Sequence, residues 1–217
     1  MIFAPLGCLA AILLVLLIPF LLLLLFFDLV SFSFGELGLS QNTAFLVISL
    51  MLVGSLINIP ISRRRVTYTP PRTVRGFFSG PQTKYSGIAL NVGGALVPFG
   101  LCLYLLTVVP SLWQIGVATV VMALVAKAIA RPIPGRGIVM PMFVPPILSA
   151  LLAILIAREF AAPCAYIAGT MGTLIGADVL NLHRARSMPG MLSIGGAGLF
   201  DGIFLVGIVA VLLTALF

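Results

Sequence analysis

The stretch Ile12-Leu-Leu-Val-Leu-Leu-Ile-Pro-Phe-Leu-Leu-Leu-Leu-Leu-Phe-Phe27 decides the class of fold, because it carries no charged side chain. It belongs to an apolar run from Ile2 to Phe27. A helix of about 20 apolar residues crosses the hydrocarbon core of a bilayer, so this run is long enough to span it. No Lys or Arg precedes the run and no Ala-x-Ala site follows it. We therefore interpret it as a retained membrane helix and not as a cleaved signal peptide.

The composition of the whole chain agrees with this interpretation. Of its 217 residues, 61% are hydrophobic and only 8% are charged. Soluble domains carry roughly 45–50% apolar and about 25% charged residues. The polar side chains are too few to cover a water-facing surface, which excludes a soluble domain, a disordered chain and a secreted disulfide scaffold. We expect one integral membrane domain over residues 1–217.

Seven apolar runs predict an all-α, polytopic bundle of transmembrane helices. Their expected bounds are residues 2–27, 43–61, 85–109, 113–130, 138–157, 161–182 and 192–217, with a basic cytoplasmic loop over 62–84. Pro145 and Pro146 lie early in the fifth run, and proline removes a helical hydrogen bond. We therefore expect the fifth span to be broken in its cytoplasmic half.

The positive charges predict how the chain lies in the membrane. The net charge is +7, and every Lys and Arg except Arg158 falls in three gaps on one side of the predicted spans. Cytoplasmic loops retain Lys and Arg during insertion, so the N-terminus is expected inside and the C-terminus outside a cell (inner) membrane. This clustering argues against a nucleic-acid partner. It would also suit anionic lipid headgroups, although topology alone accounts for it.

Two carboxylates fall within the predicted spans, and they are the strongest functional signal. A charged side chain at a helix centre costs roughly 2.5–3.5 kcal/mol on insertion scales, so such residues are usually functional. Asp178 lies roughly 7 Å from the cytoplasmic end of the sixth span, and Asp201 roughly 12 Å from the same end of the seventh. Because these spans are consecutive and antiparallel, the two carboxylates are expected to meet.

Further residues are expected at the same depth. The polar side chains Asn58, Asn91 and Asn181 would support the carboxylates, and Asn181 shares a helix face with Asp178. Small residues and prolines would allow close backbone approach or a locally unwound helix; these are Gly176, Gly195, Gly196, Gly198, Pro145 and Pro146.

Two facing aspartates permit three uses. They can share a proton, so that one acid donates while the other activates water, as in aspartic proteolysis. They can instead bind and release a coupling ion in a proton- or cation-coupled transporter of small solutes. They can also be structural, fixing the helix register through hydrogen bonds. The three cysteines, Cys8, Cys102 and Cys164, are scattered and match no metal spacing, and no cofactor motif is present.

Several motifs resemble a family of uncharacterised prokaryotic multi-pass membrane proteins, a domain of unknown function. They are Asn91-Val-Gly-Gly-Ala-Leu-Val-Pro, Gly176-Ala-Asp-Val-Leu-Asn-Leu, Ser193-Ile-Gly-Gly-Ala-Gly-Leu-Phe-Asp-Gly-Ile-Phe, and Arg131-Pro-Ile-Pro-Gly-Arg-Gly-Ile with Pro145-Pro146. The resemblance covers roughly residues 50–217. It implies a fold and a membrane location, and no activity.

A weaker likeness, to a family of intramembrane aspartyl proteases, implies a catalytic activity. Gly196-Ala-Gly-Leu-Phe-Asp201-Gly-Ile-Phe is similar to the Gly-x-Gly-Asp element of presenilin, signal peptide peptidase and prepilin peptidase. This likeness implies that Asp178 and Asp201 are the catalytic pair and that the substrate is a membrane-spanning peptide. The chain departs from the pattern in two places. Leu199 and Phe200 separate the second glycine from the aspartate, and no Pro-Ala-Leu element follows Asp201.

Overall fold

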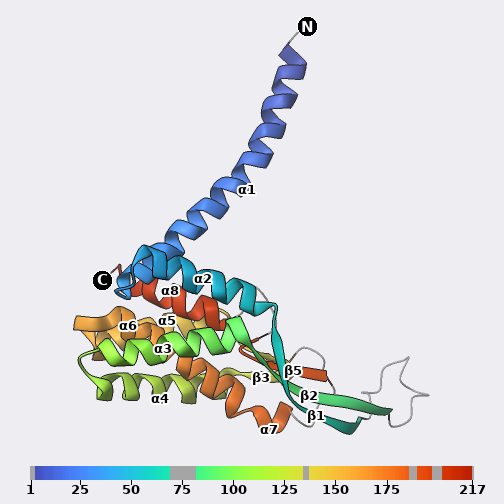
Figure 1. The fold of residues 1–217 in the computed structure, drawn as a ribbon, viewed down its shortest axis with the longest axis vertical. Coiled ribbons are helices and arrows are strands. Elements are labelled where there is room, and N and C mark those ends of the chain that lie inside the picture. The colour runs from blue at the N-terminus through green and yellow to red at the C-terminus, as the bar shows by residue number, and fades with distance from the viewer. Residues whose placement is uncertain (1–2, 69–81, 134–136, 186–189, 197–201, 217) are drawn as a thin grey trace.

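The computed structural model describes residues 3–68, 82–133, 137–185, 190–196 and 202–216. Most helices lie side by side in an elongated bundle, while the first helix leaves it at an angle (Figure 1). The α-helices are α1 (Phe3–Glu36), α2 (Gln41–Ser55), α3 (Val97–Val108), α4 (Leu112–Ile129), α5 (Val144–Ile156), α6 (Ala161–Thr173), α7 (Leu182–Ala185) and α8 (Gly202–Thr214). Two π-helical segments, η1 (Val92–Leu96) and η3 (Leu174–Val179), and a short 3-10 turn, η2 (Arg158–Phe160), adjoin them.

A small mixed sheet lies at one end of the bundle, which we call the sheet end (Figure 1). Its strands are β1 (Asn58–Tyr68), β2 (Gln82–Asn91) and β5 (Gly190–Ile194), in the order β1-β2-β5. Strands β1 and β2 pair antiparallel, whereas β2 and β5 pair in parallel from Ser86↔Gly190 to Leu90↔Ile194. A separate hairpin of β3 (Arg131–Ile133) and β4 (Gly137–Val139) lies at the same end.

The sheet corrects the prediction of an all-α fold. Residues 58–61 and 85–91, expected at the ends of helical spans, are strands, and so are residues 62–68 and 82–84 of the expected basic loop. The physical reason is visible in the period of two through Ile57, Ile59 and Ile61, where β-branched residues alternate with Asn58 and Pro60. Pro60 is accommodated because β1 is an edge strand with a register shift between Pro60 and Ser62.

The last and the fifth predicted spans are also shorter as helices than expected. Residues 190–194 form β5, and α8 begins only at Gly202. Helix α5 begins at Val144, with Pro145 and Pro146 in its first turn, where proline is tolerated because the N–H groups there have no helical partner. The prolines therefore start the helix and do not break it.

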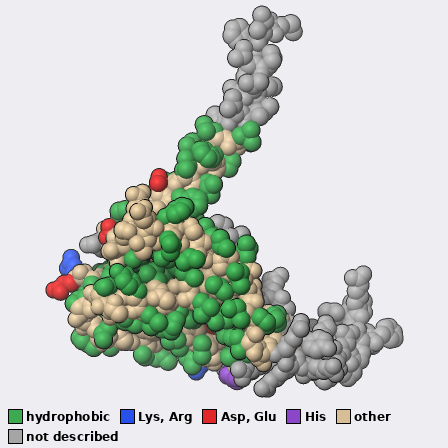
Figure 2. Space-filling view, viewed as in Figure 1, with side chains coloured by type: hydrophobic (Ala, Val, Ile, Leu, Met, Phe, Trp, Pro, Cys, Tyr) green, Lys and Arg blue, Asp and Glu red, His purple; other side chains and the backbone are tan. Residues whose placement is uncertain are grey.

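Three helices among the described residues are long and apolar enough to cross a membrane: Val15–Glu36, Leu112–Ile129 and Arg158–Val179. The other apolar helices are shorter, and strands continue several of them at the sheet end. The visible surface of the bundle is largely hydrophobic, with charged side chains near its margins (Figure 2). These features support contact with a lipid bilayer. They do not show the seven separate helical spans that the sequence predicted.

Helix α1 is longer than the predicted first span. It contains Pro19 and continues beyond Phe27, the predicted end of the span, as far as Glu36. Only its last turns join the bundle, where Val30 and Phe34 are buried, and the rest projects away (Figure 1). Ser40 then caps α2 by accepting a hydrogen bond from the backbone N–H of Thr43 at 3.3 Å.

The core of the bundle is built around α6, which packs against α3, α4, α5 and α8. Glycines let these helices approach closely. A Cβ atom at Gly169 would lie 2.9 Å from Ser149 Oγ on α5, and one at Gly172 would lie 2.6 Å from Met122 on α4. At Gly176, in η3, a Cβ atom would overlap the carbonyl oxygen of Ala123. The central helix therefore reaches the sheet end firmly packed, which fixes the position of Asp178.

Candidate functional site

Asp178 lies in the π-helical continuation of α6, close to the sheet. Its Oδ2 atom accepts a hydrogen bond of 2.8 Å from the backbone N–H of Gly195, and the side chain is half-buried. The π-helical geometry is marked by the hydrogen bond from Leu180 N to Ile175 O, five residues back. Such segments often occur at functional sites. This contact joins η3 to the turn that follows β5, although 17 residues separate the two partners in sequence.

The turn after β5 depends on two glycines. Gly195 and Gly196 have φ values of +81° and +77°, a region that side chains with a Cβ atom rarely adopt. Gly195 is also in close contact with η1, since a Cβ atom there would lie 2.6 Å from Ala95. The turn therefore presents a backbone N–H to Asp178 on one side and packs on η1 on the other.

Asn91 connects this turn to α2. The side chain is buried, and its Nδ2 atom donates to the carbonyl oxygen of Ser55 at 2.7 Å and to Asn58 Oδ1 at 3.2 Å. Its Oδ1 atom accepts from the backbone N–H of Gly94 at 2.6 Å and so caps η1. One amide thus satisfies backbone groups at the end of α2 and at the start of η1, groups that would otherwise be buried without partners.

Ser193 extends the same network to β5. Its hydroxyl contacts Asn58 Oδ1 at 2.7 Å and the carbonyl oxygen of Gly196. Asn58 and Asn91 also face one another as the first pair of the β1–β2 register. We call Ser55, Asn58, Asn91, Asp178 and Ser193, with the backbone of Gly94, Gly195 and Gly196, the polar junction.

Backbone contacts make the polar junction rigid. A Cβ atom at Gly93 would overlap Met51 O and Ser55 N, so α2 and η1 touch main chain to main chain. A Cβ atom at Gly94 would overlap the carbonyl oxygen of Gly195. Main-chain atoms cannot move aside as a flexible side chain can, and these two glycines therefore fix the Gly195 turn relative to α2.

Asn181 and Asp178 have different hydrogen-bond partners. Asn181 is fully buried, and its Nδ2 atom donates to the carbonyl oxygen of Gly176 at 3.2 Å and to that of Lys127, on α4, at 3.5 Å. Asp178 instead contacts Gly195. Asn181 therefore ties η3 to α4, whereas Asp178 ties it to the sheet.

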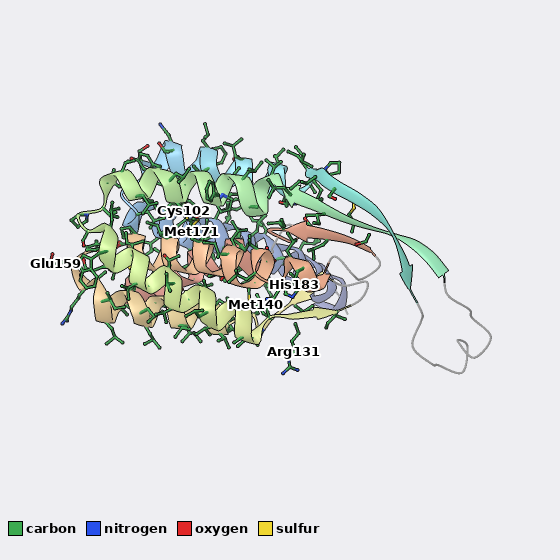
Figure 3. All side chains as sticks on the ribbon, turned by 90° about the horizontal axis from the view of Figure 1, so that it is seen from below. Cys102, Arg131, Met140, Glu159, Met171 and His183 are labelled. Carbon is green, nitrogen blue, oxygen red and sulfur yellow. The ribbon has the colours of Figure 1, made fainter. Side chains whose placement is uncertain are left out.

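Other predicted residues lie apart or outside the described part of the chain. Asp201 and Gly198 belong to residues 197–201, which are not described. Pro145 and Pro146 are buried at the start of α5, where Ser149 Oγ donates to Pro146 O at 3.2 Å. His183, the one histidine in the sequence, was not among the predicted residues and is exposed on α7 (Figure 3).

Sequence reasoning missed Ser55, Ser193 and the role of Gly94. Ser55 acts through its carbonyl oxygen, which no side-chain pattern reveals. Ser193 directly precedes the Ile194–Gly195–Gly196 segment, and a serine beside a glycine turn was a usable signal. Gly94 stood within a quoted motif, but its partner Gly195 is about a hundred residues away along the chain.

Residues 52–213 match the family described as "Protein of unknown function (DUF1614)". The chain belongs to this family. The match covers every residue of the polar junction and leaves out α1 and most of α2. No curated protein and no solved structure matches the chain.

The polar junction of this DUF1614 protein places the Asp178 carboxylate among neutral polar groups. Within the described ranges, no three His, Cys, Asp or Glu side chains are grouped so that they could hold a metal ion. What the site offers is a carboxylate positioned by a backbone N–H, amide and hydroxyl groups beside it, and a strand edge. Among the residues that the structure describes, β5 pairs with β2 along one edge and has no paired strand along the other.

Proposed function

We propose that this protein is an intramembrane hydrolase that cleaves membrane-spanning peptides with Asp178 and Asp201 as a catalytic pair. The observation that supports it most is the 2.8 Å hydrogen bond from Gly195 N–H to Asp178 Oδ2. This bond holds Asp178 at the segment that leads to Asp201. Six residues of chain reach at most about 22 Å, which limits how far Asp201 can lie from Gly195. Helix α8, which begins one residue after Asp201, packs against α6.

The proposed reaction needs two carboxyl groups that share one proton. The ionised aspartate takes a proton from water, whose oxygen attacks the peptide carbonyl carbon. The protonated aspartate donates its proton to the carbonyl oxygen, and collapse of the tetrahedral intermediate breaks the C–N bond with proton transfer to the leaving nitrogen. Water is consumed, and a carboxyl and an amine are formed. We assign the water-activating role to Asp178, whose Oδ2 accepts the Gly195 N–H, and the proton-donating role to Asp201.

In this proposal an extended substrate binds at the sheet end, beside β5. Unpaired strand backbone at membrane depth is tolerated only against protein or in a water-filled cavity. Among the described residues, the edge of β5 that does not face β2 has no paired strand, although β4 lies near it. A peptide pairing with this edge would run toward Gly195 and Asp178, and main-chain hydrogen bonds of this kind bind extended peptides largely independently of sequence.

We further propose that the sheet end is cytoplasmic and that the membrane is the cell (inner) membrane. The β1–β2 hairpin carries Arg63, Arg64, Arg65 and Lys84 in its strands, and Lys127 and Arg131 lie at the same end. Arg158 lies with Glu159 at the opposite end (Figure 3). The asymmetry of Lys and Arg is the signal that sets orientation during insertion.

Cleavage of a fluorogenic transmembrane peptide by purified full-length protein in liposomes tests the proposal. Asp178→Asn and Asp201→Asn are each expected to lower the rate about 10³-fold or more, as loss of one member of a catalytic unit does. Glu159→Gln, exposed at the far end, is the matched control and should retain full activity. Equal cleavage by wild type and both aspartate variants would refute the pair. Proton-driven solute flux lost in Asp178→Asn, without cleavage, would favour a transporter instead.

A further inference from the structure

The β3–β4 hairpin combines a cationic residue with exposed apolar side chains. Arg131 is paired opposite Val139, so the two share a face of the hairpin, and Ile133 lies two residues further along the same strand. All three are exposed, Val139 at 42% and Ile133 at 38%. A surface that is apolar with a cation at its margin matches the boundary between acyl chains and phosphates in a bilayer.

The last turn of α4 adds a second cation beside this hairpin. Lys127 is exposed, and Arg131 follows four residues later, directly after the helix ends. The backbone there is fixed, because Asn181 Nδ2 donates to the carbonyl oxygen of Lys127. The Lys127 backbone is therefore held by Asn181, and the Arg131 backbone by the pairing of β3 with β4.

The direction of the Arg131 side chain indicates whether it contacts lipid headgroups or a soluble partner. Its side chain extends sideways from the bundle, away from the helices, and not beyond the sheet end (Figure 3). Lipid headgroups surround a membrane protein on its sides, whereas a soluble partner approaches from beyond its end. Nearby, Phe143 is 63% exposed just before α5, so the apolar surface continues along the bundle from this point.

We propose that Arg131 and Lys127 bind the phosphate of an anionic phospholipid in the leaflet around the sheet end, with Ile133 and Val139 against its acyl chains. A guanidinium can donate two parallel hydrogen bonds to a phosphate, and an ammonium adds a point charge. This lipid site is independent of the proposed hydrolysis, since neither residue belongs to the polar junction.

Native mass spectrometry of the full-length protein in detergent tests the site, with dioleoyl phosphatidylglycerol and dioleoyl phosphatidylcholine as probes. Wild type should bind the phosphatidylglycerol more tightly. Each basic residue near a membrane surface contributes about 1 kcal/mol, so Arg131→Gln or Lys127→Gln should weaken that binding about fivefold. Arg131→Lys should retain part of the affinity. Arg158→Gln, an exposed cation at the opposite end, is the matched control and should bind like wild type.

Three results would overturn the proposal. Equal binding of the two lipids would show that the headgroup charge is not recognised. Wild-type affinity in Arg131→Gln and Lys127→Gln would show that these cations do not bind the lipid. They would then serve to set the membrane topology or to contact an acidic protein. Full competition by millimolar inorganic phosphate would indicate a site for free phosphate. Thermal unfolding in phosphatidylcholine micelles controls for folding, and the three Gln variants should melt with wild type because all three side chains are exposed.

Discussion

Replacing Gly94 by alanine tests whether the polar junction depends on main-chain contact. The added Cβ atom would overlap the carbonyl oxygen of Gly195 and lie 3.2 Å from Asn91 Oδ1. Neither neighbour moves freely, because Gly195 is main chain in a left-handed conformation and Asn91 is buried with three hydrogen bonds. The Gly195 turn must therefore shift, and its hydrogen bond to Asp178 must lengthen.

The expected cost follows from these contacts. Over-packing in a tight site costs about 1–3 kcal/mol. Weakening a hydrogen bond to a charged group costs up to about 1.5–3 kcal/mol more. The higher helix propensity of alanine offsets about 0.5–1 kcal/mol of this loss in stability. Gly94→Ala should therefore destabilise the protein by about 2–3 kcal/mol, a fall in Tm of about 5–10 °C for a chain of this size.

Thermal unfolding in mild detergent measures this effect, with Gly100→Ala as the matched control. Gly100 lies in α3, shortly after η1, and no atom lies within 4 Å of the position that its Cβ would take. Gly100→Ala should melt at or slightly above the wild-type temperature. If Gly94→Ala melts with Gly100→Ala and keeps the same peptide cleavage, the close approach of Gly94 and Gly195 does not hold the site.

Two further substitutions test other parts of the packing. Asn91→Ala should cost about 2–4 kcal/mol, because Ser55 O and Gly94 N–H would be left buried without partners; an unfolding transition unchanged from wild type would contradict this. Gly176→Ala should cost about 1–3 kcal/mol, since its Cβ would overlap Ala123 O. Gly116→Ala on exposed α4 surface serves as its control, and equal melting of the two would show that α4 and η3 can separate freely.

Composition and hydropathy were sufficient to predict a helical membrane protein, because the exclusion of charge from long runs depends only on local sequence. They did not predict the sheet. Residues 58–61 and 85–91 carry no charge, like the helices they follow or precede, and a hydropathy window averages over the period of two that marks a strand. The pairing of β2 with β5 joins segments about a hundred residues apart, which no local pattern encodes.

The sequence predicted only part of the candidate site, because it reveals polar side chains and not the backbone contacts between distant segments. Buried polar side chains are costly in a membrane, so Asn58, Asn91 and Asp178 stood out from the sequence, and the structure joins the first two by a hydrogen bond. The contact of Asp178 is to a backbone N–H of Gly195, and backbone groups carry no sequence signal. Asn181 donates to the carbonyl oxygen of Lys127 on α4, another backbone contact that carries no sequence signal.

Cross-linking of Asp178→Cys with Asp201→Cys tests the central claim most directly, in a protein whose three native cysteines are replaced by alanine. A short bifunctional thiol reagent applied to membranes should join the two positions, because a shared proton requires the two carboxyl groups to come within hydrogen-bond reach. The pair Glu159→Cys and Asp201→Cys is the control and should stay unlinked. Failure of the first pair to link, or equal linking of both pairs, would contradict a two-aspartate site.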